Sequence, residues 1–218
     1  MPTNRLGSTC VVDRLESSIL ILRQKCPILC KVHDVTGSPY LWQVPSGFAG
    51  IARIVVGQQL SVASAEAIWK RCEDIIRPMA PDTVLGLDDV VMKMAGLSSF
   101  KIRTMRALSE AVINDKLNFE RMVDLNDNEV RKTLITFYGI GPWTIEIFLL
   151  FCLGRLDAFA AGDLALKAAV QRAFDLPKRP SIDELQNLSN NWRPLRGIAS
   201  HLLWSYYNIM CKKNTNLG

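Results

Sequence analysis

Apolar residues recur at helical spacing along most of the chain. In residues 13–26, "DRLESSILILRQKC", the side chains of Leu15, Ile19 and Leu22 fall on one helical face. Runs that alternate between polar and β-branched residues are missing, so the pattern predicts an all-α protein. Similar apolar patterns predict further helices over residues 47–60, 61–76, 88–94, 98–115, 126–138, 142–153, 162–174, 181–188 and 193–212.

Polar residues and glycines mark where these helices begin and end. Residues 1–12 carry Pro, Thr, Asn, Gly and Ser with little periodicity, which predicts a flexible tail. The stretch "TGSPYLWQVPSG" predicts a turn-rich connector. Ser61 stands between two helices as an N-cap candidate, and Asn126 with Glu129 three residues later has the spacing of a capping box.

The stretch "FYGIGPWTIEIFLL", residues 137–150, breaks one helix and restarts another at once. Glycine allows the positive φ angles that a tight reversal needs, and Pro142 suits the first position of the second helix. The backbone amides of such a corner lack intrahelical partners and can bind an anion, of which a DNA phosphate is the natural example. A plain helix–turn–helix corner without a ligand fits the pattern equally well. The candidate phosphate-binding residues are Gly139, Ile140, Gly141 and Thr144.

Composition narrows the class of protein without identifying it. With 49% hydrophobic and 22% charged residues, the 218-residue chain can form a large core in one domain or two lobes. No apolar run approaches the roughly 20 residues of a membrane span, and no signal peptide is visible, so we expect a protein that is neither membrane-bound nor secreted. The net charge of +5 fits a nucleic-acid binder but also many other proteins. The six scattered cysteines form neither a zinc site nor an iron–sulfur motif, and we expect reduced thiols.

Three motifs in order resemble the helix-hairpin-helix DNA glycosylase superfamily, in particular its branch typified by 3-methyladenine DNA glycosylase II. They are "IVVGQQLSVASAEAIWKR", "GIGPWT" followed by "RLDAFAAGDLALKAAV", and "WRPLRGIASHLLW". The resemblance covers about residues 14–210. It implies a two-lobed all-α fold with an active-site cleft between the lobes, in a compact form without the N-terminal β domain of larger members. The implied lobes are residues 13–45 with 156–211, and residues 46–155, the latter ending in the helix-hairpin-helix at 126–153.

Asp163 matches the family's catalytic aspartate. It precedes a predicted helix, so it is also an N-cap candidate, and a helix N-terminus favours a negative charge. An anion beside the sugar stabilises the positive charge that develops as the glycosidic bond breaks. Ala160 stands where many relatives have a proline, which leaves the stiffness of this loop open. Glu146 and Asp157 are the alternative candidates for the catalytic carboxylate, and each could instead be a surface or capping group.

The resemblance assigns aromatic residues to a pocket for the extruded base. Trp143 and Trp204 match pocket positions, where tryptophan faces stack on electron-poor alkylated purines; each could instead be a core residue. Ile147 stands where some relatives have tyrosine. Trp143 also occupies the position of the lysine nucleophile in bifunctional relatives, and tryptophan cannot form a Schiff base. The resemblance therefore implies a monofunctional enzyme.

Other polar residues have weaker assignments. Gln59, or less clearly Gln58, matches the residue that fills the space left by the extruded base, although both could simply end a helix. His201 is expected to be a partly buried histidine without a chemical role. Four basic residues are candidates for contact with the DNA backbone, although each could instead be an ordinary solvated charge: Lys101, Arg103, Arg106 and Lys132.

The implied function is hydrolytic excision of alkylated bases such as 3-methyladenine from damaged double-stranded DNA by a monomer without a cofactor. A cation held by hairpin carbonyls is possible from the sequence, and no other metal is expected. The location would be the cytoplasm or nucleoid in a prokaryote and the nucleus in a eukaryote. A uracil, deaminated-base or etheno-base glycosylase, and a non-catalytic DNA-lesion-binding protein, remain the alternatives.

Overall fold

A computed structural model describes the backbone of residues 5–215 and the side chains of residues 15–210. Contacts divide the chain into two compact units. The terminal unit contains the chain up to Trp42 together with the chain from Leu156, and the middle unit is Gln43–Arg155. The first boundary lies before the predicted residue 46, because the Val44 amide already bonds to the Phe151 carbonyl of the middle unit at 3.1 Å.

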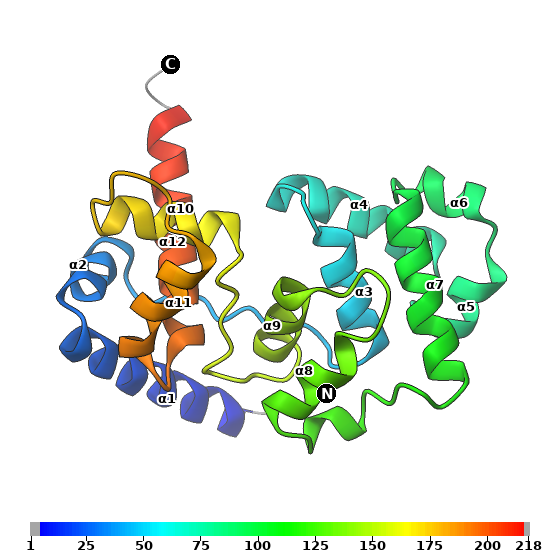
Figure 1. Ribbon diagram of the computed structural model, residues 1–218, viewed down its shortest axis with the longest axis horizontal. Helices are drawn as coiled ribbons and strands as arrows, with labels where there is room; N and C mark the ends of the chain where they lie inside the picture. Colours follow the sequence, from blue (N-terminus) through cyan, green and yellow to red (C-terminus); the bar gives the residue numbers. More distant parts are fainter. Residues whose placement is uncertain (1–4, 216–218) are drawn as a thin grey trace. The chain divides into compact units, whose positions relative to one another are not determined.

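Both units are helical, and residues 5–215 contain no strand (Figure 1). The all-α prediction is therefore confirmed. The terminal unit consists of α1 (Arg5–Lys25), α2 (Pro27–Thr36), α10 (Leu164–Ala173), α11 (Ile182–Ser189), the 3₁₀ helix η2 (Asn190–Trp192) and α12 (Arg196–Thr215). The middle unit consists of α3 (Phe48–Gly57), α4 (Val62–Ile75), α5 (Pro81–Gly86), α6 (Asp89–Met94), α7 (Ser99–Ile113), the 3₁₀ helix η1 (Arg121–Val123), α8 (Asp127–Leu134) and α9 (Pro142–Phe151).

Each unit has a core of its own. In the terminal unit α12 packs against α2 and α10, and the buried Trp192 ring lies 5.9 Å from that of Phe159 and 6.1 Å from that of Phe174. In the middle unit α7 packs against α3 and α5, and α9 packs against α3 and α8. The buried rings of Phe119 and Phe148 lie 5.8 Å apart there. These cores hold α9, α10 and α12 in place; α9 carries Trp143 and Ile147, α12 carries Trp204, and Asp163 caps α10.

The two N-caps predicted in the middle unit are confirmed. The Ser61 hydroxyl accepts a hydrogen bond from the Ser64 amide at the start of α4. Asn126 and Glu129 form a reciprocal capping box at the start of α8. Each cap satisfies amides that no intrahelical carbonyl can reach, which is why a local pattern is enough to predict it.

Two of the predicted boundaries were wrong, and two helices were not predicted. α1 starts at Arg5, so residues 5–12 belong to a helix and not to a flexible tail, because a nucleated helix gains one hydrogen bond for each added residue; residues 1–4 lie outside the described part. α8 ends at Leu134, and residues 135–138 form successive turns instead of a fourth helical turn. The apolar pattern predicted neither α2 nor α5, although Pro27 and Pro81 at their first positions were available signals.

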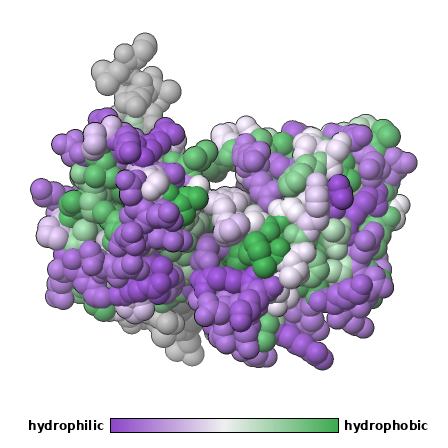
Figure 2. All heavy atoms as spheres, in the orientation of Figure 1, coloured by the Kyte–Doolittle hydropathy of each residue, from purple (hydrophilic) through white to green (hydrophobic). Residues whose placement is uncertain are grey.

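Hydrophilic residues cover most of the face shown in Figure 2, and hydrophobic residues occur there in small groups. Within the described residues, no helix combines the length and the apolar character needed to cross a bilayer.

Candidate functional site

Asp163 is the N-cap of α10 and has two firmly placed donors. Its Oδ1 atom accepts a hydrogen bond from the Leu166 amide at 2.8 Å and another from the indole Nε1 of Trp204 at 3.0 Å. The first donor belongs to the first turn of α10 and the second to α12, so two packed helices fix the orientation of the carboxylate. Both donors also stabilise negative charge on this half-buried group.

The loop before Asp163 is held by packing. Ala158, Phe159, Ala160 and Ala161 are all buried, and the Asp163 amide donates to the Ala160 carbonyl at 2.9 Å. Alanine at position 160 therefore does not leave the loop without support, because burial of four consecutive residues restricts it where relatives use proline.

His201 supports the other side of Trp204. Its ring meets the Trp204 ring edge to face at a centroid distance of 5.6 Å, and it hydrogen-bonds to the backbone of Tyr40. His201 is only 3% exposed, which makes it more deeply buried than the sequence suggested. A chain of contacts thus runs from Tyr40 through His201 and Trp204 to Asp163, all within the terminal unit.

Burial lowers the pKa of His201 to about 4, and the Tyr40 hydrogen bond only partly offsets this effect. Above the unfolded-state pKa of about 6.5, the ring is neutral in both the folded and the unfolded protein. As the pH falls below that value, the unfolded chain takes up the proton first, so stability is lost between about pH 6.5 and about pH 4. We expect the free energy of unfolding to fall by about 2 kcal/mol more between about pH 7 and about pH 5 in the wild type than in His201→Gln.

Urea denaturation at the two pH values measures this difference directly. The comparison uses the change with pH in each protein, so a constant stability loss caused by the substitution cancels. Equal pH dependence in wild type and variant would show that His201 takes up its proton equally in the folded state, contrary to its burial.

The hairpin between α8 and α9 contains one obligatory glycine. Gly139 has φ +76°, and a Cβ atom added there would lie 2.0 Å from Oγ1 and 3.0 Å from Cβ of Thr104 on α7. Any side chain would therefore collide with α7 as well as strain the backbone. At Gly141, by contrast, the φ of −106° and ψ of 176° are extended and need no glycine.

The outer side of the hairpin is open. A Cβ atom added to Gly141 meets no atom within 4 Å, and Pro142 occupies the first position of α9 as predicted. The first amides of a helix have no intrahelical acceptor, and here they follow a residue with open space around it. The Ile140 and Thr144 side chains are buried at 4% and 2% exposure, so these two predicted residues can offer an anion only backbone groups.

Gln58 has a contact that the sequence did not reveal. It follows the last residue of α3, and its side-chain amide donates to the Gly139 carbonyl at 3.0 Å and to the Thr144 hydroxyl at 2.8 Å. Gln58 therefore connects the end of α3 to both sides of the hairpin. Its neighbour Gln59 is exposed and has φ +57°, which directs the chain sharply away from the helix end. Of the two candidates for filling the space of an extruded base, Gln59 is the one whose side chain is accessible.

Trp143 and Ile147 lie one turn apart on α9. Trp143 is partly exposed in the first turn of the helix, whereas Ile147 is buried at 4% exposure. Trp143 comes two residues after the hairpin, so the conformation of residues 139–141 fixes the position of its backbone.

The remaining charged candidates have structural partners. Glu146 forms a two-pronged ion pair with Arg131 at 2.6 and 3.1 Å, and Asp157 pairs with both Arg193 and Arg196. These contacts stabilise the helix ends and give neither carboxylate the open setting that chemistry requires.

Two of the basic residues proposed for DNA contact are also engaged. The Lys101 amine donates to the Val56 carbonyl at the end of α3 at 2.7 Å, and burial lowers the pKa of this amine. Arg106 pairs with Asp89 and bonds to the Leu87 carbonyl at 2.6 Å. The Arg103 guanidinium lies 4.1 Å from the centre of the Tyr138 ring. Lys101 and Arg106 therefore have partners within the middle unit, which neither reading of the sequence included.

The described residues contain no group of three or more His, Cys, Asp or Glu side chains that could hold a metal ion. Two of the hairpin carbonyls considered as cation ligands accept protein donors, since Phe137 bonds to the Ile140 amide and Gly139 to Gln58.

Comparison with known proteins assigns this arrangement to a family. Residues 52–194 match the family described as HhH-GPD superfamily base excision DNA repair protein, and the chain belongs to that family. It is similar to the alkylbase DNA glycosidase-like protein mag2 of Schizosaccharomyces pombe, with 28% identity over 80% of this chain and 83% of the relative. It is 30% identical to DNA-3-methyladenine glycosylase 1 of the same yeast, over 71% of this chain and 69% of the relative.

Among solved structures, the fold matches that of the Schizosaccharomyces pombe 3-methyladenine DNA glycosylase in complex with abasic DNA. The TM-score is 0.82 at 26% identity, and the match covers 86% of this chain and 95% of the other. A DNA-3-methyladenine glycosidase from Bacillus halodurans gives a TM-score of 0.75 at 26% identity, covering 90% and 91% of the two chains. The match over nearly the whole of both chains confirms the helix-hairpin-helix glycosylase fold.

Proposed function

We propose that this protein is a monofunctional DNA glycosylase that hydrolyses the bond between deoxyribose and an alkylated base in double-stranded DNA. The observation that carries the proposal is the Asp163 carboxylate, held at the start of α10 by the Leu166 amide and the Trp204 indole. The relatives named as 3-methyladenine glycosylases support alkylated purines as the substrate class.

The chemistry follows from charge. Cleavage of the glycosidic bond leaves the sugar with oxocarbenium character, and a fixed carboxylate nearby stabilises that charge more in the transition state than in the ground state. The same group can orient a water molecule and accept its proton as the water attacks the sugar. Because donors from two helices hold Asp163, little reorganisation is needed when the positive charge appears.

Recognition of the base relies on aromatic faces. Trp204 and Trp143 are both partly exposed, and an electron-poor, often cationic alkylated purine stacks favourably on indole. Ile147, one turn after Trp143 on the same helix, is buried at 4% exposure and offers the base little surface of its own. Gln59 would occupy the space that the extruded base leaves in the duplex.

The hairpin is the proposed binding site for a phosphate of the DNA backbone. The amides of Gly139 and Gly141 and those in the first turn of α9 suit a phosphate, whereas the Ile140 amide already donates to the Phe137 carbonyl. Open space surrounds Gly141. The hairpin contributes no charged side chain. Its effect on the salt dependence of binding therefore comes from backbone dipoles that partly neutralise the charge of a DNA phosphate.

The direct test incubates the protein with duplexes that contain an alkylated purine, uracil or ethenoadenine and measures the released base by chromatography. We expect release from the alkylated duplex. Preferential release of uracil or ethenoadenine would instead assign the fold to those lesions, and binding without release from any duplex would indicate a lesion-binding protein.

The product should be an intact strand with an abasic site, since Trp143 stands where a lysine nucleophile would be needed. Borohydride treatment during the reaction should trap no covalent adduct, as judged by denaturing gel electrophoresis. An adduct would show that another amine, for which Lys167 is the first candidate, attacks the sugar; Lys167→Gln would then abolish trapping.

A further inference from the structure

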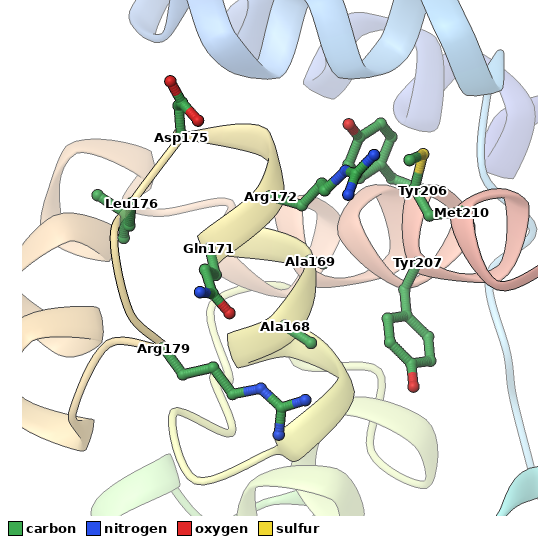
Figure 3. Close-up of a pocket in the computed structure, with 10 residues that line it drawn as sticks. All are labelled: Ala168, Ala169, Gln171, Arg172, Asp175, Leu176, Arg179, Tyr206, Tyr207 and Met210. Atoms are coloured by element: carbon green, nitrogen blue, oxygen red, sulfur yellow. The ribbon is translucent and has the colours of Figure 1, made fainter. Parts of the chain in front are cut away.

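A concave site lies entirely within the terminal unit, between α10, α12 and the loop after α10. Its volume is about 650 Å³, in the range of sites that hold small ligands or polymer segments. Figure 3 shows Arg172 extending from α10 toward α12, and Arg179 extending from the loop back toward the first turns of α10. The groove is lined by Ala168, Ala169, Gln171, Arg172, Asp175, Leu176, Arg179, Tyr206, Tyr207 and Met210.

The two arginines of this groove have no partner among the described residues. Neither Arg172 nor Arg179 forms a hydrogen bond or ion pair with any side chain or carbonyl of the described residues, and both are exposed. In the same unit, by contrast, Arg193 and Arg196 are both paired with Asp157, and Arg23 is paired with Asp34. Exposed guanidinium groups that line a concavity without a protein partner are suited to an anion from outside.

Positive charge outweighs negative charge within the groove. The groove itself contains two arginines against one carboxylate, that of Asp175. Tyr206 and Tyr207 add planar rings, and the short side chains of α10 leave room between them.

We propose that this groove binds the sugar–phosphate backbone of the DNA that flanks the lesion, with Arg172 and Arg179 on phosphates. The inference rests on the proposed function, because it takes Asp163 as the point where the lesion is held. Asp163 begins α10, and Arg172 lies nine residues further along the same helix, which corresponds to about 13.5 Å at about 1.5 Å per residue. Since duplex DNA advances about 3.4 Å per base pair, a duplex that reaches both groups must extend at least about four base pairs beyond the lesion.

DNA is favoured over an acidic protein segment by the composition of the groove. Protein–DNA interfaces are more polar and more positive than those between proteins, and their arginines contact phosphates in two-pronged geometry. Protein interfaces centre on aromatic anchors that bury fully. Here the exposed groups of the groove are the charged side chains of Arg172, Asp175 and Arg179, whereas Tyr206 and Met210 are only partly exposed.

The test compares Arg172→Gln/Arg179→Gln with the control Lys31→Gln/Arg77→Gln, which removes the same charge from exposed positions elsewhere in the chain. Each protein is titrated with duplexes that carry a stable abasic-site analogue and have about twelve base pairs on both sides. In one series of duplexes the flank on one side of the lesion is shortened to about three base pairs, and in a second series the flank on the other side. In one of the two series the DNA is then too short to reach the groove, which needs about four base pairs.

For the wild type and the control, we expect affinity to fall by about tenfold when one flank becomes shorter than about four base pairs. The groove variant should be weaker by about tenfold on the long duplex and should show no further loss on shortening. Its log–log slope of affinity against salt should be smaller by about two than that of the control. Equal flank dependence in variant and control would overturn the inference, as would a slope equal to that of the control.

This experiment is separable from the proposed chemistry. Base release by excess enzyme from a long alkylated duplex tests the glycosylase activity, whereas flank dependence is scored on DNA that has no base to release. If no lesion is excised but the groove variant loses its flank dependence, the groove assignment stands and the enzymatic function fails. If bases are excised and the flank dependence is unchanged, only the groove assignment fails.

Discussion

Asp163→Asn is expected to reduce base release by about a hundredfold or more while the protein stays folded and binds DNA. Asparagine caps a helix about as well as aspartate, so the Leu166 amide and the Trp204 indole both keep an oxygen acceptor. What the substitution removes is the negative charge beside the sugar. Single-turnover base release with excess enzyme measures the effect without interference from product dissociation.

The matched control is Asp88→Asn, the same exchange at the N-cap of α6, where the side chain accepts from the Val90 amide at 2.7 Å. It should leave base release unchanged. If Asp163→Asn retained most of the activity, Asp163 would be a helix cap and nothing more. Glu146 and Asp157 could not readily replace it, since both are held in ion pairs with arginines.

Gly139→Ala should lower the free energy of unfolding by about 2–4 kcal/mol. The alanine would have to adopt the left-handed backbone conformation of Gly139, and its Cβ atom would overpack against α7. The added Cβ would lie 3.0 Å from the Cβ of Thr104, so rotation of the threonine hydroxyl does not relieve the contact and the backbone must move. The Gly139 carbonyl would move with it and weaken the Gln58 hydrogen bond. Affinity for both lesion-containing and plain duplexes should therefore fall.

Gly141→Ala is the control within the same hairpin. Its backbone is extended and its Cβ position is empty, so stability should change by less than about 0.5 kcal/mol. Urea denaturation measures both variants, and fluorescence anisotropy measures their affinity for duplex DNA. A Gly139→Ala protein with wild-type stability would contradict the packing described here. Unchanged affinity in a Gly139→Ala protein that has lost stability would show that the hairpin is a corner without a phosphate.

The parts of the fold that were predicted correctly depend on short-range chemistry. The Ser61 cap and the Asn126–Glu129 capping box each join groups three residues apart, so the pattern of residues contains the whole interaction. The same holds for Pro142 at the start of α9 and for Asp163 as the cap of α10. Helix ends without such a signal were predicted less well, as the early end of α8 at Leu134 shows.

The candidate site divides along the same line. The sequence alone indicated Asp163, the glycine corner and the tryptophans, through local patterns and through family resemblance. It did not indicate that Lys101 is buried against Val56, because charge patterns do not show which face of a helix is covered. It also did not indicate which of the two glycines has positive φ. Only Gly139 has it, and the close approach of α7 leaves no room for a side chain there.

By itself, the sequence determined an all-α chain, most of its helices, their polar caps and the aspartate placed at the start of α10, because each depends on residues within about one helical turn. Only the tertiary structure decided which groups those residues meet. Trp204 reaches Asp163 across 41 positions, Gln58 reaches Gly139 across 81, and Arg172 lines a groove with Tyr206 of another helix. The physical reason is that such contacts are selected by the packing of whole helices, in which no single residue's local preference specifies its distant partner.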